Sequence, residues 1–446
     1  MKINFQLAFF LLALFLIKLP PFYILPLQSR LYTTHTVAKL IIFFEFFFLL
    51  LISYKNDILA ILKNSTFLLV TIYFISQSIS IIHAKDIVFF LKYYQTTISV
   101  YLIFLLAFHL INNSSERIKK IFDFVIITGL ICLFFEFIYI IFNNQITNLF
   151  NVFLQEEVLA TYFFNINRGR FYLYITYELF LPFFLYKIYQ NIKLSHIKNT
   201  FIYFVVSIFL IFLSVFSNFR RPILLNIFSI IFYLYFIFKR STKKIKKIYS
   251  TFVIVSIMTI FVTISISNSL FSFNVVDRFV LSDKLEDVGS LNFRVDSFKN
   301  AIDMFKSEPI FGVGLGNYKY YVGKPIETYY YSSNNQKIVI SDVNPHSIIS
   351  RTIAETGLFG IFSLIIMLLY FIKRDLLYFS THKIGILYPF IISFWTMFVF
   401  ALFSPFDTVF LNGWFWFLRG IIEKFYLSKL KNKEVGVPKS SNKSNL

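Results

Sequence analysis

The sequence SDVNPHSIISRTIAETGLFG, residues 341–360, joins a long polar segment to a new apolar run. It places one histidine, His346, between a proline and a predicted helix start. Arg351 and Glu355 follow one and two turns further on, at the spacing that puts side chains on one helix face. We look for chemistry in this titratable cluster, because it lies at the edge of a predicted membrane span and beside the largest predicted loop.

Outside this stretch, the chain has the composition of a membrane protein. Of its 446 residues, 57% are hydrophobic and 15% are charged, whereas a soluble domain averages about 25% charged residues. Length alone would suggest two or three soluble domains. The repeated long apolar runs override that expectation and indicate a chain that crosses a membrane many times.

The net charge of +20 does not require a nucleic-acid partner. Most lysines and arginines sit in short segments between apolar runs, and the positive-inside rule explains such a distribution better than nucleic-acid binding does. The single cysteine, Cys132, lies within an apolar run. An intrachain disulfide and a cysteine metal site are therefore excluded.

The sequence predicts an all-α fold, a polytopic bundle of about twelve transmembrane helices, because about 20 apolar residues are needed for each crossing. The first apolar run lacks a small-residue cleavage site, so we expect it to be a retained span. The predicted spans are residues 5–19, 38–54, 66–82, 88–111, 121–142, 171–189, 201–217, 222–238, 249–267, 356–372, 384–403 and 408–427.

Alternate loops carry most of the lysines and arginines, which predicts that both termini are cytoplasmic. The predicted organisation follows from that orientation. Nine spans occupy residues 1–267, a large helical extracytoplasmic loop residues 268–346, three further spans residues 347–427, and a disordered cytoplasmic tail residues 428–446.

The large loop contains an amphipathic stretch, residues 294–305, in which apolar side chains recur at helical spacing. These side chains are Val295, Phe298, Ile302 and Phe305. The run GVGLG, residues 312–316, comes next. It lacks the strand before and the helix after that a nucleotide-binding loop needs, so it predicts a turn.

Two arginines, Arg220 and Arg221, open a predicted span on the outer side, against the charge rule. A guanidinium group binds phosphate oxygens through two parallel hydrogen bonds, so a diphosphate at the membrane surface is a suitable ligand. Anchoring to lipid headgroups explains the same two residues equally well. The sequence leaves both interpretations open.

His346 is a candidate general base, since a neutral histidine can take a proton from a hydroxyl group. The alternative is a histidine at a helix start that only hydrogen-bonds solvent. Arg294 opens the amphipathic stretch of the loop, and its alternative is a solvated surface charge. Neither alternative is excluded by the residues alone.

Three carboxylates lie within predicted spans, namely Glu45, Glu136 and Glu178. Ionisable groups there mark a pathway or an internal pair. Glu178, close to Arg170, is nearest the outer face and is a candidate partner for an arginine of the site. The sequence has no zinc-ligand pattern, no aspartate-rich metal motif and no serine elbow, so no metal and no cofactor are expected.

Taken together, these motifs resemble the O-antigen ligase and O-antigen polymerase superfamily of bacterial envelope enzymes. The resemblance is carried by Ser217 with Arg220 and Arg221, by RVDSFKNAIDMFKSEPIFGVGLGNY (residues 294–318), and by His346 followed by ten residues and Gly357. It covers roughly residues 217–372, whereas the rest of the chain agrees in topology alone.

The resemblance implies an inverting, metal-independent membrane glycosyltransferase. Such an enzyme moves a glycan from undecaprenyl diphosphate to an acceptor sugar in O-antigen, capsule or exopolysaccharide assembly, on the outer face of the bacterial inner membrane. The acceptor would be lipid A–core sugar for a ligase and the next repeat unit for a polymerase. By the same resemblance, Arg220, Arg221 and Arg294 would bind the diphosphate and His346 would activate the acceptor hydroxyl, with Glu355, Arg351, Glu178 and Arg170 in support.

Two other classes of function remain to be weighed. A secondary transporter also has about twelve spans with both ends in the cytoplasm. It should show similar halves and distinctive residues near mid-span, whereas here the distinctive residues gather at the outer surface. A purely structural role leaves the loop motif unexplained.

Overall fold

The computed structural model describes residues 2–18, 34–52, 64–110, 115–141, 177–216, 220–270, 285–322, 326–331, 337–342, 345, 347–402 and 413–434. His346 and Arg170 lie outside these residues, and so do the side chains of Arg220 and Arg221. The described elements are α1 (Lys2–Lys18), α2 (Thr34–Ile52), α4 (Ser65–Ile79), η2 (Ser80–His83), α5 (Ile87–Leu110), α6 (Ser115–Ile141), η4 (Tyr177–Phe180), α9 (Leu181–Lys193), α10 (Ile197–Phe216), α11 (Arg220–Arg240), α12 (Lys243–Leu270), α13 (Leu285–Ser307), α14 (Tyr318–Tyr321), β1 (Ile326–Tyr331), β2 (Lys337–Asp342), α15 (Ile348–Thr381), α16 (Leu387–Leu402) and α17 (Gly413–Glu434).

The predicted helical fold class is confirmed. Among the described residues, seven helices are long and apolar enough to cross a membrane. They lie within α4 with η2, α5, α6, α10, α11, α12 and α15. Each of the other predicted spans also overlaps a helix, but α1 and α16 are shorter apolar helices. The number twelve therefore stays a prediction.

The first half of helix α17 lies inside the bundle. Its residues from Gly413 to Glu423 are all buried, and it packs against α5 and α16. The Trp416 ring lies 4.9 Å from the Phe74 ring of α4 and 6.1 Å from the Tyr73 ring, between ring centroids. A helix that is buried all round forms the core of a large bundle, so α17 holds α4 and α5 at fixed positions beside α15.

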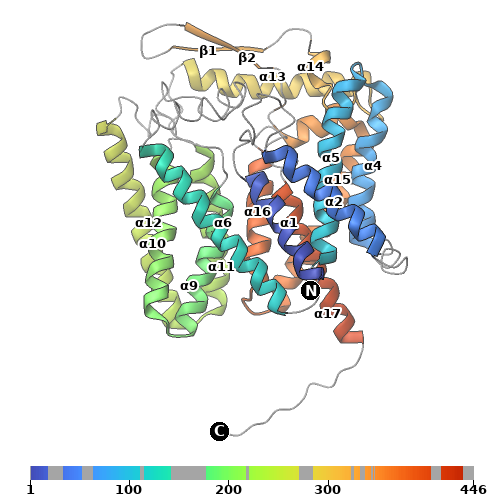
Figure 1. Ribbon diagram of the computed structural model, residues 1–446. Helices are drawn as coiled ribbons and strands as arrows, with labels where there is room; N and C mark the ends of the chain where they lie inside the picture. Colours follow the sequence, from blue (N-terminus) through green and yellow to red (C-terminus); the bar gives the residue numbers. More distant parts are fainter. Residues whose placement is uncertain are drawn as a thin grey trace.

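The segment between α12 and α15 forms a separate layer. Figure 1 shows α13 lying across one end of the bundle, with the hairpin of β1 and β2 beyond it. The two strands are antiparallel and pair Ile326 with Asp342 and Tyr331 with Lys337. The expectation of a wholly helical loop missed this hairpin, whose strands are rich in aromatic and β-branched residues that favour extended backbone.

Candidate active site at the start of α15

The helix α15 begins directly after the position of His346 because Ser347 caps it. Ser347 has extended backbone angles, and its hydroxyl oxygen accepts a hydrogen bond from the Ile349 amide at 3.2 Å. The Ser347 carbonyl accepts the first helical bond, from the Arg351 amide at 3.0 Å. A serine cap satisfies amides that the first helical turn leaves without partners. The predicted helix start is therefore confirmed.

Two turns later, α15 is broken at Gly357, which has φ 60° and ψ −155°. In a straight helix the next two amides would bond to carbonyls four residues earlier. Instead, the Leu358 amide donates to the Pro309 carbonyl at 2.8 Å and the Phe359 amide to the Ile310 carbonyl at 3.2 Å. The break thus transfers two helical donors to the segment that follows α13.

The two carbonyls released by this break are used by the same segment. The Ala354 carbonyl accepts a hydrogen bond from the Val313 amide at 2.9 Å, and the Glu355 carbonyl accepts one from the Gly314 amide at 3.1 Å. The glycine-rich segment is therefore hydrogen-bonded into the gap in α15. The two amides and the two carbonyls therefore all keep hydrogen-bond partners. Buried backbone groups need such partners, so the break is stable.

The glycines of GVGLG are required by this close approach. Gly312, Gly314 and Gly316 have φ values of 71°, 99° and 75°, a region that glycine enters without steric cost. A Cβ atom on Gly312 would lie 2.4 Å from the backbone carbonyl carbon of Glu355. The predicted turn is confirmed. Its glycines allow the backbone of the turn to pack directly against the backbone of α15.

The far side of this turn docks on the connection between η2 and α5. The Leu315 amide donates to the Ser80 hydroxyl at 3.1 Å, and the Asp86 amide donates to the side-chain oxygen of Asn317 at 2.8 Å. The Tyr320 hydroxyl donates to the Asp86 carboxylate at 2.5 Å. This bond lowers the pKa of Asp86, because it stabilises the charged form. The turn is thus held between α15 and the connection from the end of α4 to the start of α5.

Arg351 and Glu355 lie on one face of α15, as their spacing predicts, and they form a buried ion pair on its first turns. The Nε atom of Arg351 lies 2.7 Å from Oε2 of Glu355, and their side chains are 6% and 2% exposed. The Arg351 guanidinium also lies 4.9 Å from the centre of the Tyr93 ring of α5. The Arg351 guanidinium is thus held by a carboxylate and by an aromatic ring, and these two contacts fix the geometry of the ion pair.

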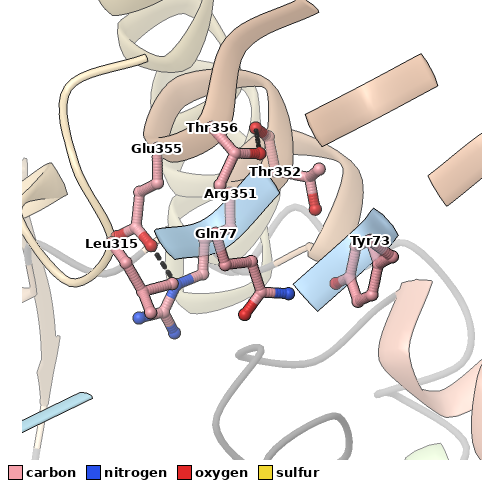
Figure 2. A pocket seen from close by; sticks show the side chains of 7 residues that line it. All are labelled: Tyr73, Gln77, Leu315, Arg351, Thr352, Glu355 and Thr356. Carbon is pink, nitrogen blue, oxygen red and sulfur yellow. Dashed lines mark hydrogen bonds and ion pairs between the residues drawn. The ribbon is translucent and has the colours of Figure 1, made fainter. Parts of the chain in front are cut away.

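A small polar pocket surrounds this ion pair. Figure 2 shows Arg351 bonded to Glu355, with side chains of α4, α15 and the glycine-rich turn around them. The lining residues are Tyr73, Gln77, Leu315, Arg351, Thr352, Glu355 and Thr356. The side-chain oxygen of Gln77 is buried and has no hydrogen-bond partner within the described structure. The α15 residues that line the pocket, 351–356, lie in the first three turns after the N-cap Ser347.

Arg294 lies on the helix that packs against α15. Ala301 and Met304 of α13 are buried in one cluster with Ala354 of α15 and Tyr318. Arg294 is half-buried, two turns before Ala301. The structure therefore fixes the helix that carries Arg294 on the helix that follows His346.

The backbone of Arg220 and Arg221 forms the first two residues of α11. This helix ends at Arg240, and a corner of two residues leads into α12. The start of α11 therefore lies at the same end of the bundle as the end of α12, the end that α13 crosses in Figure 1. All three predicted motifs thus have their described backbone at one end of the molecule.

Glu178 is fully buried on η4. Lys18, at the end of α1, is also buried and lies within electrostatic range of Glu178. The helix η4 packs against α6, α9, α11 and α16. The sequence did not indicate Lys18 as a partner, because the two residues are far apart in the chain.

Sequence reasoning missed a second charged cluster. Arg419 of α17 is fully buried and donates to the Asp375 carboxylate of α15 at 2.8 Å and to Glu423. Arg374 also bonds Glu423, and its guanidinium donates to the Thr66 hydroxyl at 2.7 Å. The signal was present in the sequence as a charged pair four residues apart inside an apolar run.

This second cluster lies away from the motif residues. Asp375 is 18 residues beyond Gly357, which is about 27 Å along a helix. The cluster joins α4, α15 and α17, so it is part of the packing of the bundle. Within the described residues, no group of three His, Cys, Asp or Glu side chains is placed to hold a metal ion.

Residues 205–365 match the family model described as O-antigen ligase. This segment of the chain is similar to the O-antigen ligase family. The matched segment runs from α10 through the first turns of α15, so it includes the start of α11, α13, the glycine-rich turn and the break at Gly357. Neither the curated proteins nor the solved structures that were compared contain a significant match. The similarity to the O-antigen ligase family and the seven apolar helices among the described residues both point to a membrane protein.

Proposed function

We propose that this protein is an inverting, metal-independent glycosyltransferase that moves a glycan from undecaprenyl diphosphate to an acceptor sugar. The observation that carries the proposal is the O-antigen ligase domain match over residues 205–365, which includes Arg220, Arg221, Arg294 and His346. The packing of α13 on α15 supports it, because this packing fixes the Arg294 helix beside the helix that starts after His346.

The reaction proposed is a single displacement. His346 accepts the proton of the acceptor hydroxyl as that oxygen attacks the anomeric carbon, and the bond from this carbon to the diphosphate oxygen breaks. The diphosphate leaves with the electron pair of that bond. Arg220, Arg221 and Arg294 stabilise the negative charge that develops on it. Attack and departure on opposite faces of the sugar invert the anomeric centre.

Arg351 and Glu355 act as positioning residues in this proposal. Their ion pair is buried in the first turns of α15 and contacts Tyr93, so it stabilises the part of the helix that directly follows His346 in the sequence. Glu178 and Arg170 are proposed to support the arginines of α11. On the proposed topology the site is at the outer face of the bacterial inner membrane and both termini are cytoplasmic, because the basic corner between α11 and α12 lies at the opposite end of the bundle.

Glycan transfer by purified protein tests these roles. The substrates are an undecaprenyl-diphosphate-linked oligosaccharide and an acceptor glycan. His346→Ala and Arg294→Ala are each expected to lower the rate by about 100-fold or more, the usual effect of removing a general base or a charge-stabilising group. Lys306→Ala is the matched control, because Lys306 lies on the exposed face of the same helix. Wild-type rates in both test variants would refute the assigned roles.

The acceptor separates the two branches of the proposal. Transfer to lipid A–core sugar indicates a ligase, whereas a ladder of polymerised repeats indicates a polymerase. The family match gives the transporter alternative no support. Uptake of labelled glycan into vesicles without formation of a new glycosidic bond would restore that alternative.

A further inference from the structure

The helix α13 contacts the protein through a narrow face of small and medium-sized residues. Ser297, Ala301 and Met304 are buried, and the Tyr318 hydroxyl donates to the Ser297 carbonyl at 2.7 Å. These positions are three and four residues apart, so they line one side of the helix. The four larger apolar residues of the amphipathic stretch are on a different side.

That neighbouring side is an apolar stripe, which we define as Val295, Phe298, Ile302 and Phe305. Val295 and Phe298 are each 46% exposed, although the hairpin strand β1 also packs against α13. Ile302 and Phe305 are half-exposed. At about 100° per residue, the stripe covers roughly 80° of the helix. The largest apolar side chains of this segment of α13 are thus only partly covered by the protein.

A polar face borders the apolar stripe. It carries two exposed ion pairs, Lys299 with Asp296 at 3.2 Å and Lys306 with Asp303 at 3.6 Å. A helix with one apolar face and one charged face, lying across the ends of membrane spans, has the layout of an interfacial helix. The lysine stems can extend along apolar surface while their ammonium groups reach water.

The apolar stripe is continuous with the lipid-facing surface of a membrane span. Ile310 follows α13, is 58% exposed, and accepts the hydrogen bond from Phe359 of α15. Phe359 and Phe362 are exposed on α15, at 36% and 57%. Because α15 is long and apolar enough to cross a membrane, these two side chains belong to a face that lipid would cover. The exposed apolar surface thus passes from α15 through Ile310 to α13.

We propose that the apolar stripe of α13 lies in the membrane leaflet at this end of the bundle, with the two ion pairs in water. The occupant is the leaflet itself, since the stripe continues a lipid-facing surface and ends beside paired charges. The leaflet is the outer one, and this assignment rests on the proposed function. Arg294, which immediately precedes the stripe, would then lie at the depth of lipid phosphates, where a lipid diphosphate presents its leaving group.

Site-directed spin labelling measures this depth without requiring activity. The single cysteine, Cys132, is buried, so a Cys132→Ala background leaves one labelled position per variant. Phe298→Cys tests the apolar stripe and Asp303→Cys is the matched control on the polar face. Each full-length variant is placed in a bilayer of phosphatidylethanolamine and phosphatidylglycerol. Collisions of the label with oxygen, which partitions into lipid, are compared with collisions with a water-soluble nickel complex.

The label at residue 298 is expected to collide more with oxygen, and the label at residue 303 more with the nickel complex. Preferential nickel collisions at residue 298 would place the stripe in water and overturn the inference. Low collision rates with both reagents there would mean that protein, for example a second copy of the chain, covers the stripe, and this result also overturns it.

A glycan-transfer assay then tests whether the membrane depth of the apolar stripe affects the reaction. Phe298→Asp is expected to raise the KM for the lipid-linked donor at least about tenfold, because a charge resists insertion into the leaflet, whereas Asp303→Asn keeps the wild-type KM. An unchanged KM in Phe298→Asp overturns the link to Arg294. If the wild type transfers no glycan, the proposed function fails while the collision result still decides the depth. If transfer occurs but residue 298 faces water, the inference alone fails.

Discussion

Gly357 shows how one residue can decide the geometry of the candidate site. Its backbone angles lie in a region that is essentially restricted to glycine. A Cβ atom there would lie 2.6 Å from the Ile310 carbonyl oxygen and 2.7 Å from the Gly312 amide nitrogen. Both neighbours are backbone atoms, which cannot rotate away. The glycine that follows His346 in the motif is therefore required by the exchange of hydrogen bonds between α15 and the glycine-rich turn.

Substitution of Gly357 by alanine tests this requirement. Gly357→Ala is expected to destabilise the protein by about 3 kcal/mol, since the backbone strain is joined by two steric conflicts. The midpoint of thermal unfolding in detergent measures the effect. Gly385→Ala is the matched control, because its nearest new contact would be an ordinary 3.7 Å. Equal midpoints for the two variants would contradict the assigned role of Gly357.

Residue-level prediction from the sequence succeeded where a local rule was sufficient. The spacing of Arg351 and Glu355 predicted that they share one helix face, and the glycine run predicted a turn. The insertion of that turn into α15 could not be predicted, because it depends on hydrogen bonds between residues about 45 positions apart. The partnership of Lys18 with Glu178 was hidden for the same reason.

At the scale of elements, the buried charges near the end of α15 connect helices that are distant in the chain. Arg419 and Arg374 carry two positive charges, and Asp375 and Glu423 carry two negative charges, so the cluster is balanced. Trp395 of α16 and Tyr426 of α17 also donate to Asp375, at 2.7 and 2.8 Å. This cluster fixes the part of α15 after the break at Gly357 to α4, α16 and α17.

A double-mutant cycle at Arg419 and Asp375 measures the coupling. Arg419→Met is expected to cost about 3–5 kcal/mol of stability, because it leaves a surplus of buried negative charge. The double variant with Asp375→Asn is expected to recover part of that loss, since the uncompensated charge is removed. Thermal unfolding in detergent gives the four midpoints. Additive effects of the two substitutions would mean that the pair is not coupled, contrary to the 2.8 Å contact.

Element prediction from the sequence had a clear limit. Long apolar runs indicated helices, and every predicted span overlaps one, because backbone groups in lipid must bond within the segment. Apolar content could not distinguish a helix that faces lipid from one that is surrounded by protein, such as the first half of α17. Nor did the helical expectation for the loop foresee the hairpin, whose strand pairing is set by contacts between two segments.

For the whole molecule, the structure separates two ends of the bundle. One end carries α13, the hairpin, the break in α15 and the start of α11, as Figure 1 shows for α13 and the hairpin. The other end carries the corner between α11 and α12, where Lys239, Arg240, Lys243 and Lys244 lie together. The positive-inside rule assigns such a corner to the cytoplasm. On the proposed topology the motif-bearing end is outside, which is where a donor made on a lipid carrier would be presented.

Cysteine labelling in intact cells tests that orientation. In the Cys132→Ala background, Lys299→Cys lies on the exposed face of α13 and Lys244→Cys at the basic corner. A membrane-impermeant maleimide is expected to label residue 299 in intact cells and residue 244 only after the cells are permeabilised, because the two lie at opposite ends of spans. Both variants must be labelled after permeabilisation, which shows that each cysteine is reactive. Labelling of residue 244 in intact cells, with protection of residue 299, would invert the topology and place His346 in the cytoplasm, where a nucleotide sugar rather than a lipid diphosphate would be the expected donor.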